Sequence, residues 1–174
     1  MIFIYRLLTI LFYPIFIILI YLRKLLNKED HYRYKEKIFP SNFAPDRNNK
    51  KKLIWFHAAS IGEVKSVFPL IKKLNDDKKN LEFLITTVTL SAGNIVKKKF
   101  NNYNNIKHRY FPLDVNFIIK SFLNKWTPNL VIFIDSEIWP NLILEIKSRK
   151  IPIALINGRI TKKTFNKWML VSKF

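Results

Sequence analysis

Residues 53–74 read LIWFHAASIGEVKSVFPLIKKL and pass from an apolar run into a helical pattern through a loop of small residues. The run at 53–57 has the length and apolar character of a strand that is buried on both faces. After residue 62, apolar side chains recur at helical spacing: Val64, Val67, Leu70, Ile71 and Leu74. A buried strand that leads directly into such a helix is the repeating unit of an α/β fold.

The same alternation continues toward the end of the chain. Apolar runs predict further strands at residues 83–87, 107–111, 130–134 and 152–157. Helical patterns lie between and beside them, at residues 91–100, 117–126 and 138–150. Strands that alternate with helices predict a mainly parallel sheet covered on both faces, so the expected fold class is α/β.

An apolar stretch opens the chain at residues 2–22, IFIYRLLTILFYPIFIILIYL, and is as long as the roughly 20 residues that a bilayer core requires. Arg6 and Pro14 interrupt it, and no small-residue cleavage site of a signal peptide follows. Basic residues come directly after it, which favours a cytoplasmic position for the rest of the chain. We expect a membrane anchor helix over residues 1–24, with a buried amphipathic or monotopic helix as the alternative.

Residues 25–52 predict a charged linker that ends in a basic run at residues 49–52. This run either holds the domain against anionic headgroups or is simply solvated. The whole chain carries 31 Lys and Arg against 12 Asp and Glu, a net charge of +19. Such a charge attracts nucleic acid, anionic lipid or a phosphorylated substrate, although compositional drift toward lysine explains part of it. The chain has no Cys and its three His lack metal-ligand spacing, so we expect no metal site.

Ligands bind open parallel sheets beyond the carboxyl ends of the strands, where the chain carries a first polar cluster at residues 57–63. Its small residues allow a ligand to approach the backbone. Gly62 opens the following helix, whose free N–H groups can face an anion. The helix dipole favours the ionised form of Glu63, which suits a general base. A glutamate that only complements the dipole fits the same position.

Two more clusters follow later strands. Asp135 and Glu137 come after the most apolar strand, where two carboxylates can divide acid and base roles or can merely cap the next helix. Arg159 follows the last predicted strand in the run Asn-Gly-Arg, and it suits either a phosphate contact or an ordinary turn. The chain has neither a phosphate-loop motif nor a dinucleotide-binding glycine motif, so no cofactor is expected.

Taken together and in this order, these segments resemble the 3-deoxy-D-manno-octulosonic acid (Kdo) transferases of lipopolysaccharide synthesis. The matching stretches are FHAASIGEVKSVFPLIKKL (56–74), ITTVTLSAGN (85–94), RYFPLDV (109–115), FLNKWTPNLVIFIDSEIWPNLI (122–143) and KIPIALINGRIT (150–161). The resemblance covers essentially the whole chain, and its S-x-G-E and E-x-E-L-W-P-N type motifs are specific.

The resemblance implies a two-domain glycosyltransferase B fold, with residues 53–174 as the Rossmann-like domain that binds the acceptor, the lipid A precursor lipid IVA. It implies that Glu63 is the catalytic base and that Asp135, where the family has Glu, stabilises the transition state. Ser60, Gly62, Glu137 and Arg159 are the expected substrate-binding residues. The expected location is the cytoplasmic face of the bacterial inner membrane.

The resemblance also implies a second domain that binds the donor, CMP-Kdo, and this part of the family pattern is absent from the 174 residues. We therefore expect no transferase activity from the isolated chain. One alternative is a membrane-tethered basic module for anionic lipid or nucleic acid. The chain has no recognisable nucleic-acid motif, so nucleic acid is not an expected partner. Another alternative is a glycosyltransferase of the same fold with a different sugar donor.

Overall fold

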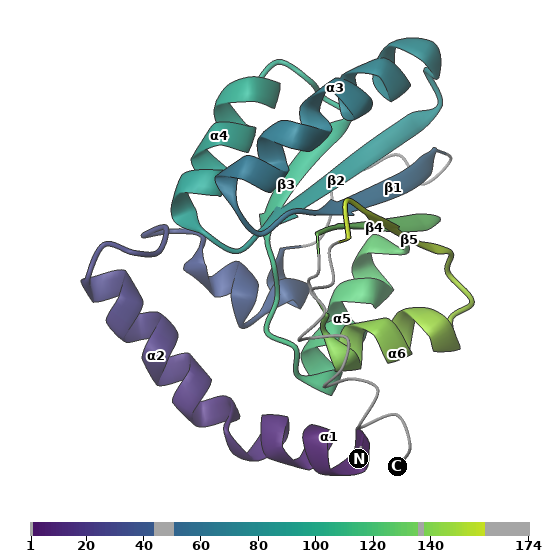
Figure 1. Cartoon of the computed structure of the whole chain (residues 1–174). Helices are drawn as coiled ribbons and strands as arrows, with labels where there is room; N and C mark the ends of the chain where they lie inside the picture. Colours follow the sequence, from purple (N-terminus) through teal and green to yellow (C-terminus); the bar gives the residue numbers. More distant parts are fainter. Residues whose placement is uncertain (1, 44–50, 136–137, 159–174) are drawn as a thin grey trace.

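A computed structural model of the chain describes residues 2–43, 51–135 and 138–158 (Figure 1). The described residues form a five-stranded sheet in the order β3-β2-β1-β4-β5, in which all neighbours are parallel. The strands are β1 (Lys52–His57), β2 (Leu81–Thr87), β3 (Ile106–Tyr110), β4 (Leu130–Ile134) and β5 (Ile153–Ile156). The crossover helices are α3 (Ile61–Asp77), α4 (Leu90–Phe100), α5 (Asn116–Trp126) and α6 (Pro140–Ser148).

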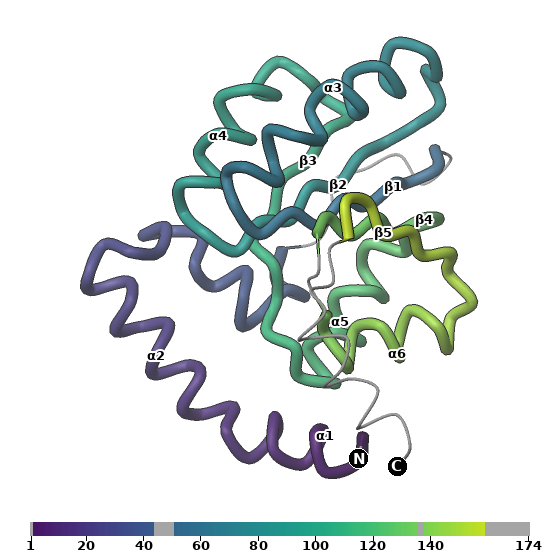
Figure 2. Tube along the Cα trace, viewed as in Figure 1, coloured from purple at the N-terminus to yellow at the C-terminus, as the bar shows by residue number. Residues whose placement is uncertain are grey.

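Helices cover both faces of the sheet (Figures 1 and 2). On one face Phe56 of β1 belongs to an apolar cluster with Val67 of α3 and residues of α4. On the other face its neighbour Trp55 packs against Phe122 of α5, with ring centroids 5.0 Å apart, in a cluster that includes Leu142 of α6. Successive strand residues point to opposite faces, so covering both faces requires the unbroken apolar runs seen in the sequence.

The predicted alternation of strands and helices is confirmed, and the differences are confined to the ends of elements. The largest is in α6, which begins at Pro140 and ends at Ser148 instead of spanning residues 138–150. Pro140 lacks an N–H and has a backbone angle suited to a first helical position, so it sets the start. Lys150 has a φ of 55°, and this left-handed conformation after the last turn ends the helix.

Residues 2–25 form two helices, α1 (Ile2–Leu11) and α2 (Tyr13–Leu25), which meet at an angle of 53°. The single anchor helix predicted over residues 1–24 is therefore not confirmed. Pro14 explains the break, because its ring removes one backbone hydrogen bond and clashes with the preceding turn. In the part of the chain that the structure describes, no single helix has the length and apolar character needed to cross a membrane, whereas the bent pair together does.

The described part of the connector, up to residue 43, is folded against the domain rather than extended through solvent. It contains two 3₁₀ turns, η1 (Tyr34–Lys37) and η2 (Pro40–Asn42), which pack beside β3 and α5. Lys37 is buried and donates hydrogen bonds to Glu29 at 2.6 Å and to the Val88 carbonyl at 2.9 Å. These two acceptors compensate the burial of the Lys37 ammonium group. The basic run at residues 49–52, for which the sequence left two alternatives open, lies partly outside the described residues.

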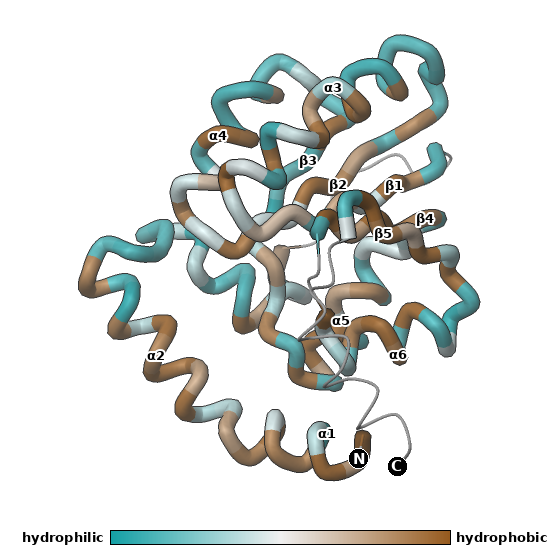
Figure 3. The backbone as a smooth tube through the Cα atoms, in the orientation of Figure 1, coloured by the Kyte–Doolittle hydropathy of each residue, from teal (hydrophilic) through white to brown (hydrophobic). Residues whose placement is uncertain are grey.

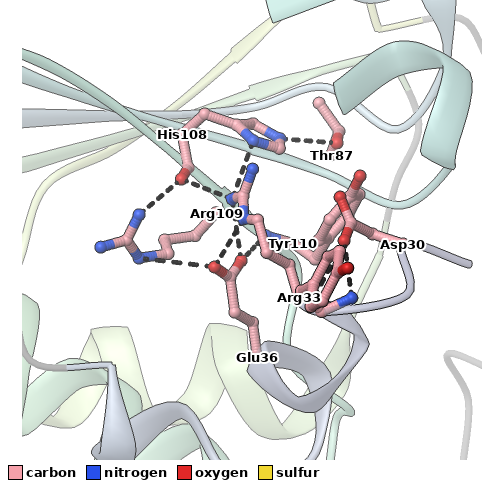
Figure 4. Close-up of polar contacts among 8 residues, drawn as sticks. Asp30, Arg33, Glu36, Thr87, His108, Arg109 and Tyr110 are labelled. Carbon is pink, nitrogen blue, oxygen red and sulfur yellow. Dashed lines mark hydrogen bonds and ion pairs between the residues drawn. The ribbon is translucent and has the colours of Figure 1, made fainter. Parts of the chain in front are cut away.

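Glu36 fastens η1 to the outer edge of the sheet (Figure 4). Its carboxylate accepts hydrogen bonds from Arg33 at 2.9 and 3.0 Å and from the backbone N–H of Tyr110 at 2.8 Å. Arg33 in turn donates to the His108 carbonyl at 2.8 Å. These side chains satisfy backbone groups of β3 that would otherwise remain open at the end of the sheet, so η1 protects an edge strand.

Candidate functional site

The order of the strands places the first two polar clusters beside each other. The direction of strand order reverses between β1 and β4, which are hydrogen-bonded neighbours with His57 in register with Phe133. The loop after β1 and the residue Asp135 after β4 therefore leave the same edge of the sheet from adjacent strands. Such a reversal is where open α/β sheets characteristically bind ligands.

Glu63 lies in the first turn of α3 and is held by the loop that precedes the helix. Its carboxylate accepts a hydrogen bond from the Ala59 N–H at 2.8 Å and one from the Ser60 hydroxyl at 2.6 Å. The Glu63 N–H donates back to the Ser60 oxygen at 3.4 Å. This reciprocal arrangement is a variant of the capping box with Ser60 as the N-cap, in which the carboxylate meets the N–H of Ala59, one residue before the N-cap. The helix-starting role that the sequence left open is therefore realised.

The capping box leaves room for chemistry at the same carboxylate. Each Glu63 oxygen accepts one hydrogen bond from the loop and keeps a further lone pair. Ser60 and Gly62 are exposed beside it, and a Cβ built on Gly62 meets only the Ser60 hydroxyl, at 4.0 Å. The loop thus fixes the direction of the carboxylate while its surroundings stay open to a ligand.

Asp135 lies directly after β4 in a left-handed conformation, with a φ of 58°. Its N–H donates to the Ile156 carbonyl at 2.9 Å, and its carboxylate accepts a hydrogen bond from the Asn157 amide at 2.5 Å. The third polar cluster therefore contributes to the same site through Asn157, which the sequence presented only as part of a turn. Glu137 and Arg159, the other predicted substrate-binding residues, lie outside the described residues.

His57 underlies the loop but is buried in the core. Its Nδ1 lies 2.9 Å from the Thr86 hydroxyl, which also accepts a hydrogen bond from the Trp55 indole at 2.8 Å. Phe111 stacks on the imidazole with centroids 4.0 Å apart. This burial lowers the pKa of His57 to about 3, so the ring is neutral at physiological pH. The imidazole is thus a core side chain at the end of β1, where the loop begins.

Asp114, which the sequence analysis did not select, organises the start of α6 just beyond the second cluster. Its carboxylate accepts hydrogen bonds from the N–H groups of Asn141 at 3.0 Å and Leu142 at 2.9 Å. The Tyr5 hydroxyl of α1 donates to the same carboxylate at 2.8 Å. Burial raises the pKa of Asp114. The sequence contains one signal for this residue: an acid that follows the third predicted strand within a few residues, in the stretch RYFPLDV.

Two pockets lie outside this pair of loops. One, of about 340 Å³, borders the loop after β2 and is lined by Arg23, Asn27, Lys28, Thr89, Leu90, Ser91 and Asn94. The other, of about 380 Å³, runs between α4 and the outer side of β3, away from Glu63. Among the described residues, no three His, Asp or Glu side chains gather as a metal site would require.

Most of the chain is similar in sequence to known proteins. Residues 32–174 fit the family model described as 3-deoxy-D-manno-octulosonic-acid transferase (kdotransferase). A probable mitochondrial Kdo transferase of Arabidopsis thaliana is 35% identical over 99% of this chain and 40% of its own length. The Kdo transferase of Rickettsia bellii is 35% identical over 94% of this chain and 38% of its own length. That of Haemophilus influenzae is 36% identical over 66% of this chain and 26% of its own length.

The chain therefore spans about two fifths of the length of the first two of these relatives, 40% and 38%. The matched residues include the β1 loop with Glu63 and the β4 end with Asp135. The family model and the relatives agree with each other, and they favour the transferase interpretation over a basic binding module. This chain belongs to the 3-deoxy-D-manno-octulosonic acid transferase family.

Proposed function

We propose that this chain is the acceptor-binding half of a glycosyltransferase that transfers Kdo from CMP-Kdo to the lipid A precursor, lipid IVA. The observation that carries the proposal is that Glu63 and Asp135 follow two adjacent parallel strands at the reversal of strand order. The donor, CMP-Kdo, would be bound mainly by a second domain of the glycosyltransferase B fold. The greater length of the relatives is consistent with such a domain.

In the proposed reaction, Glu63 is the general base. It takes the proton from a hydroxyl of the acceptor sugar while that oxygen attacks the anomeric carbon of Kdo, and the bond to CMP breaks. The capping box supports this role, because a carboxylate held by Ala59 and Ser60 loses little freedom on meeting the hydroxyl.

Asp135 is proposed to stabilise the transition state, and Asn157 is suited to orient it through their hydrogen bond. Asp135 is one methylene shorter than the Glu of the family pattern, so Glu137 can contribute to the same task. We assign substrate contacts to Ser60, Gly62, Glu137 and Arg159. These roles follow from the family motifs and from the position of the described residues at one sheet edge.

The pocket beside the loop after β2 has side chains that suit an anionic, polar acceptor headgroup. It combines two cationic side chains, Arg23 and Lys28, with the hydroxyls of Thr89 and Ser91. Its volume of about 340 Å³ is within the usual range for small-molecule sites. We propose the cytoplasmic face of the inner membrane as the location, because the acceptor is a lipid and basic residues follow the apolar helices.

A transfer assay with CMP-Kdo and lipid IVA tests the proposal. The 174 residues alone should show no turnover, and a fusion to the remaining, C-terminal part of the Rickettsia bellii relative supplies a second domain. In that fusion, Glu63→Gln should lower kcat by about 10²-fold or more, the usual contribution of a general base. Glutamine still serves in a capping box, so the fold should persist.

Asp77→Asn, at the exposed far end of the same helix, is the matched control and should keep full activity. Undiminished transfer by Glu63→Gln would remove Glu63 as the base. Robust turnover of CMP-Kdo by the isolated chain would contradict the proposed division between acceptor and donor halves.

A further inference from the structure

The two N-terminal helices present one side to the folded domain and the other side to the surroundings. Most residues of α1 and α2 are hydrophobic, as the largely brown tube shows (Figure 3), and many of their apolar side chains are exposed. Phe3 is 75% exposed, Leu11 67% and Leu25 75%, and further exposed apolar residues lie between them. An apolar surface this continuous is far beyond scattered surface residues and marks a binding face.

The inward side is tied to the domain at α1. The Tyr5 hydroxyl donates to the Asp114 carboxylate at 2.8 Å, and the Asn141 amide donates to the Thr9 hydroxyl at 3.4 Å. Tyr13, at the start of α2, meets Phe117 of α5 edge-on with centroids 5.1 Å apart. The first half of the apolar stretch therefore rests on the segment that carries Asp114 and on the first turns of α5 and α6.

The other end of the helix pair is tied to the same folded unit. Ile20 packs in a small apolar cluster with Tyr34 and Ile38 of the connector. Arg23 donates to the buried Glu29 at 2.7 Å. Polar and apolar contacts thus run from residue 5 to residue 23, and they join both ends of the pair to one domain.

These contacts conflict with a helix that crosses the bilayer. In a continuous helix, the 18 residues from Tyr5 to Arg23 rise about 27 Å, close to the thickness of a hydrocarbon core of about 30 Å. A crossing would put Tyr5 on the far side of the membrane from Asp114, which belongs to the water-facing domain. The bend at Pro14 instead lets both helices follow the domain surface.

We propose that α1 and α2 form an in-plane anchor, which lies within one leaflet with its outward face in the lipid and both ends on the side of the catalytic domain. The occupant of the apolar face is an anionic bilayer surface, because Lys24 and Lys28 lie at one end of this face beside Arg23, which also pairs with Glu29, and residues 2–28 contain no Asp or Glu. Apolar burial and attraction to anionic headgroups together are the forces that hold interfacial helices. The inference deepens the proposed membrane location and does not depend on the transfer reaction.

Topology is the direct test, and the chain suits it because it contains no Cys. The intact chain is reconstituted in sealed vesicles of phosphatidylethanolamine and phosphatidylglycerol, with one cysteine on a short polar extension ahead of Met1 or, as reference, Lys28→Cys. With an impermeant maleimide outside, an in-plane anchor gives the same labelled fraction at both positions. Labelling of the two positions from opposite sides would overturn the proposal.

The depth of α1 and α2 in the bilayer provides a second test. Nitroxides on single cysteines at Phe3, Leu11 and Leu22 should lie at one shallow depth, about 5–10 Å below the headgroups. A spanning helix would put Leu11 far deeper than the other two and would refute the in-plane arrangement.

Binding to the same vesicles tests the lipid as the occupant. Leu11→Arg should weaken co-sedimentation about tenfold or more, whereas Leu70→Arg, on α3, should bind like the parent. Failure of the parent chain to bind vesicles, with a dimer in solution covering the face, would overturn both this inference and the proposed membrane location. Opposite-side labelling with normal binding would overturn the in-plane arrangement alone.

Discussion

Acidification offers a quantitative test of the buried imidazole beneath the β1 loop. His57 is enclosed by Thr86, Trp55 and Phe111, and its pKa is lowered by burial from the ordinary value of 6.5 to about 3. As the pH falls below 6.5, the unfolded chain binds a proton at His57 that the folded chain does not. Stability is therefore full above pH 6.5 and is lost progressively as the pH falls toward 3.

The expected loss follows from the two pKa values. At pH 5 the solution is about 1.5 units below the pKa of His57 in the unfolded chain, and each unit is worth about 1.4 kcal/mol. Protonation of His57 in the unfolded chain therefore lowers the free energy of unfolding by about 2 kcal/mol relative to pH 7. The pKa of His108 is also lowered to about 3 by burial, Arg33 and Arg109, which adds to the loss in the parent chain. Against a total stability of about 5–15 kcal/mol, this change is readily measured.

The perturbation is His57→Asn, in which the amide can take the place of Nδ1 beside Thr86 but cannot titrate. Urea unfolding is followed by tryptophan fluorescence at pH 7 and pH 5, in the same detergent for the parent and the variant. The variant should lose about 2 kcal/mol less between the two pH values than the parent does. Groups common to both chains, including Asp114, cancel in this comparison. An equal loss in both chains would refute the assignment of a neutral, buried imidazole.

Two further predictions concern the stability of the domain. Gly93→Ala places a Cβ 2.8–2.9 Å from side chains of β3 and should lower the free energy of unfolding by about 1–3 kcal/mol. In the control Gly62→Ala, the nearest neighbour of the new Cβ is 4.0 Å away, so no such loss from overpacking is expected. Equal urea midpoints for the two variants would contradict this packing. Glu36→Ala removes the carboxylate that pairs with Arg33 and accepts from the Tyr110 N–H, and it should cost about 3–5 kcal/mol by urea unfolding. The exposed Asp77→Ala should stay within about 0.5 kcal/mol, and a similarly small change at Glu36 would argue against a buried ion pair.

The sequence by itself determined the elements of the domain and the residue types at their junctions. Apolar runs and helical spacing predicted the strands and crossover helices to within a few residues, because these patterns depend on neighbours along the chain. The same local reasoning indicated that Glu63 starts a helix, and the capping box with Ser60 confirms that. The family motifs then indicated which junctions carry chemistry, and those roles stay predictions.

Only the tertiary structure decided which junctions meet. The strand order puts the Glu63 loop beside Asp135, and the pairing of β4 with β5 brings Asn157 to that carboxylate. Asp114 reaches the start of α6 across 27 residues, and it also accepts a hydrogen bond from Tyr5, 109 residues away. Contacts at such separations depend on how the helices pack over the sheet, which no local periodicity encodes. For the same reason, the apolar length of the N-terminal stretch predicts one continuous helix, whereas the structure shows two helices that bend near Pro14 and contact the domain through Tyr5.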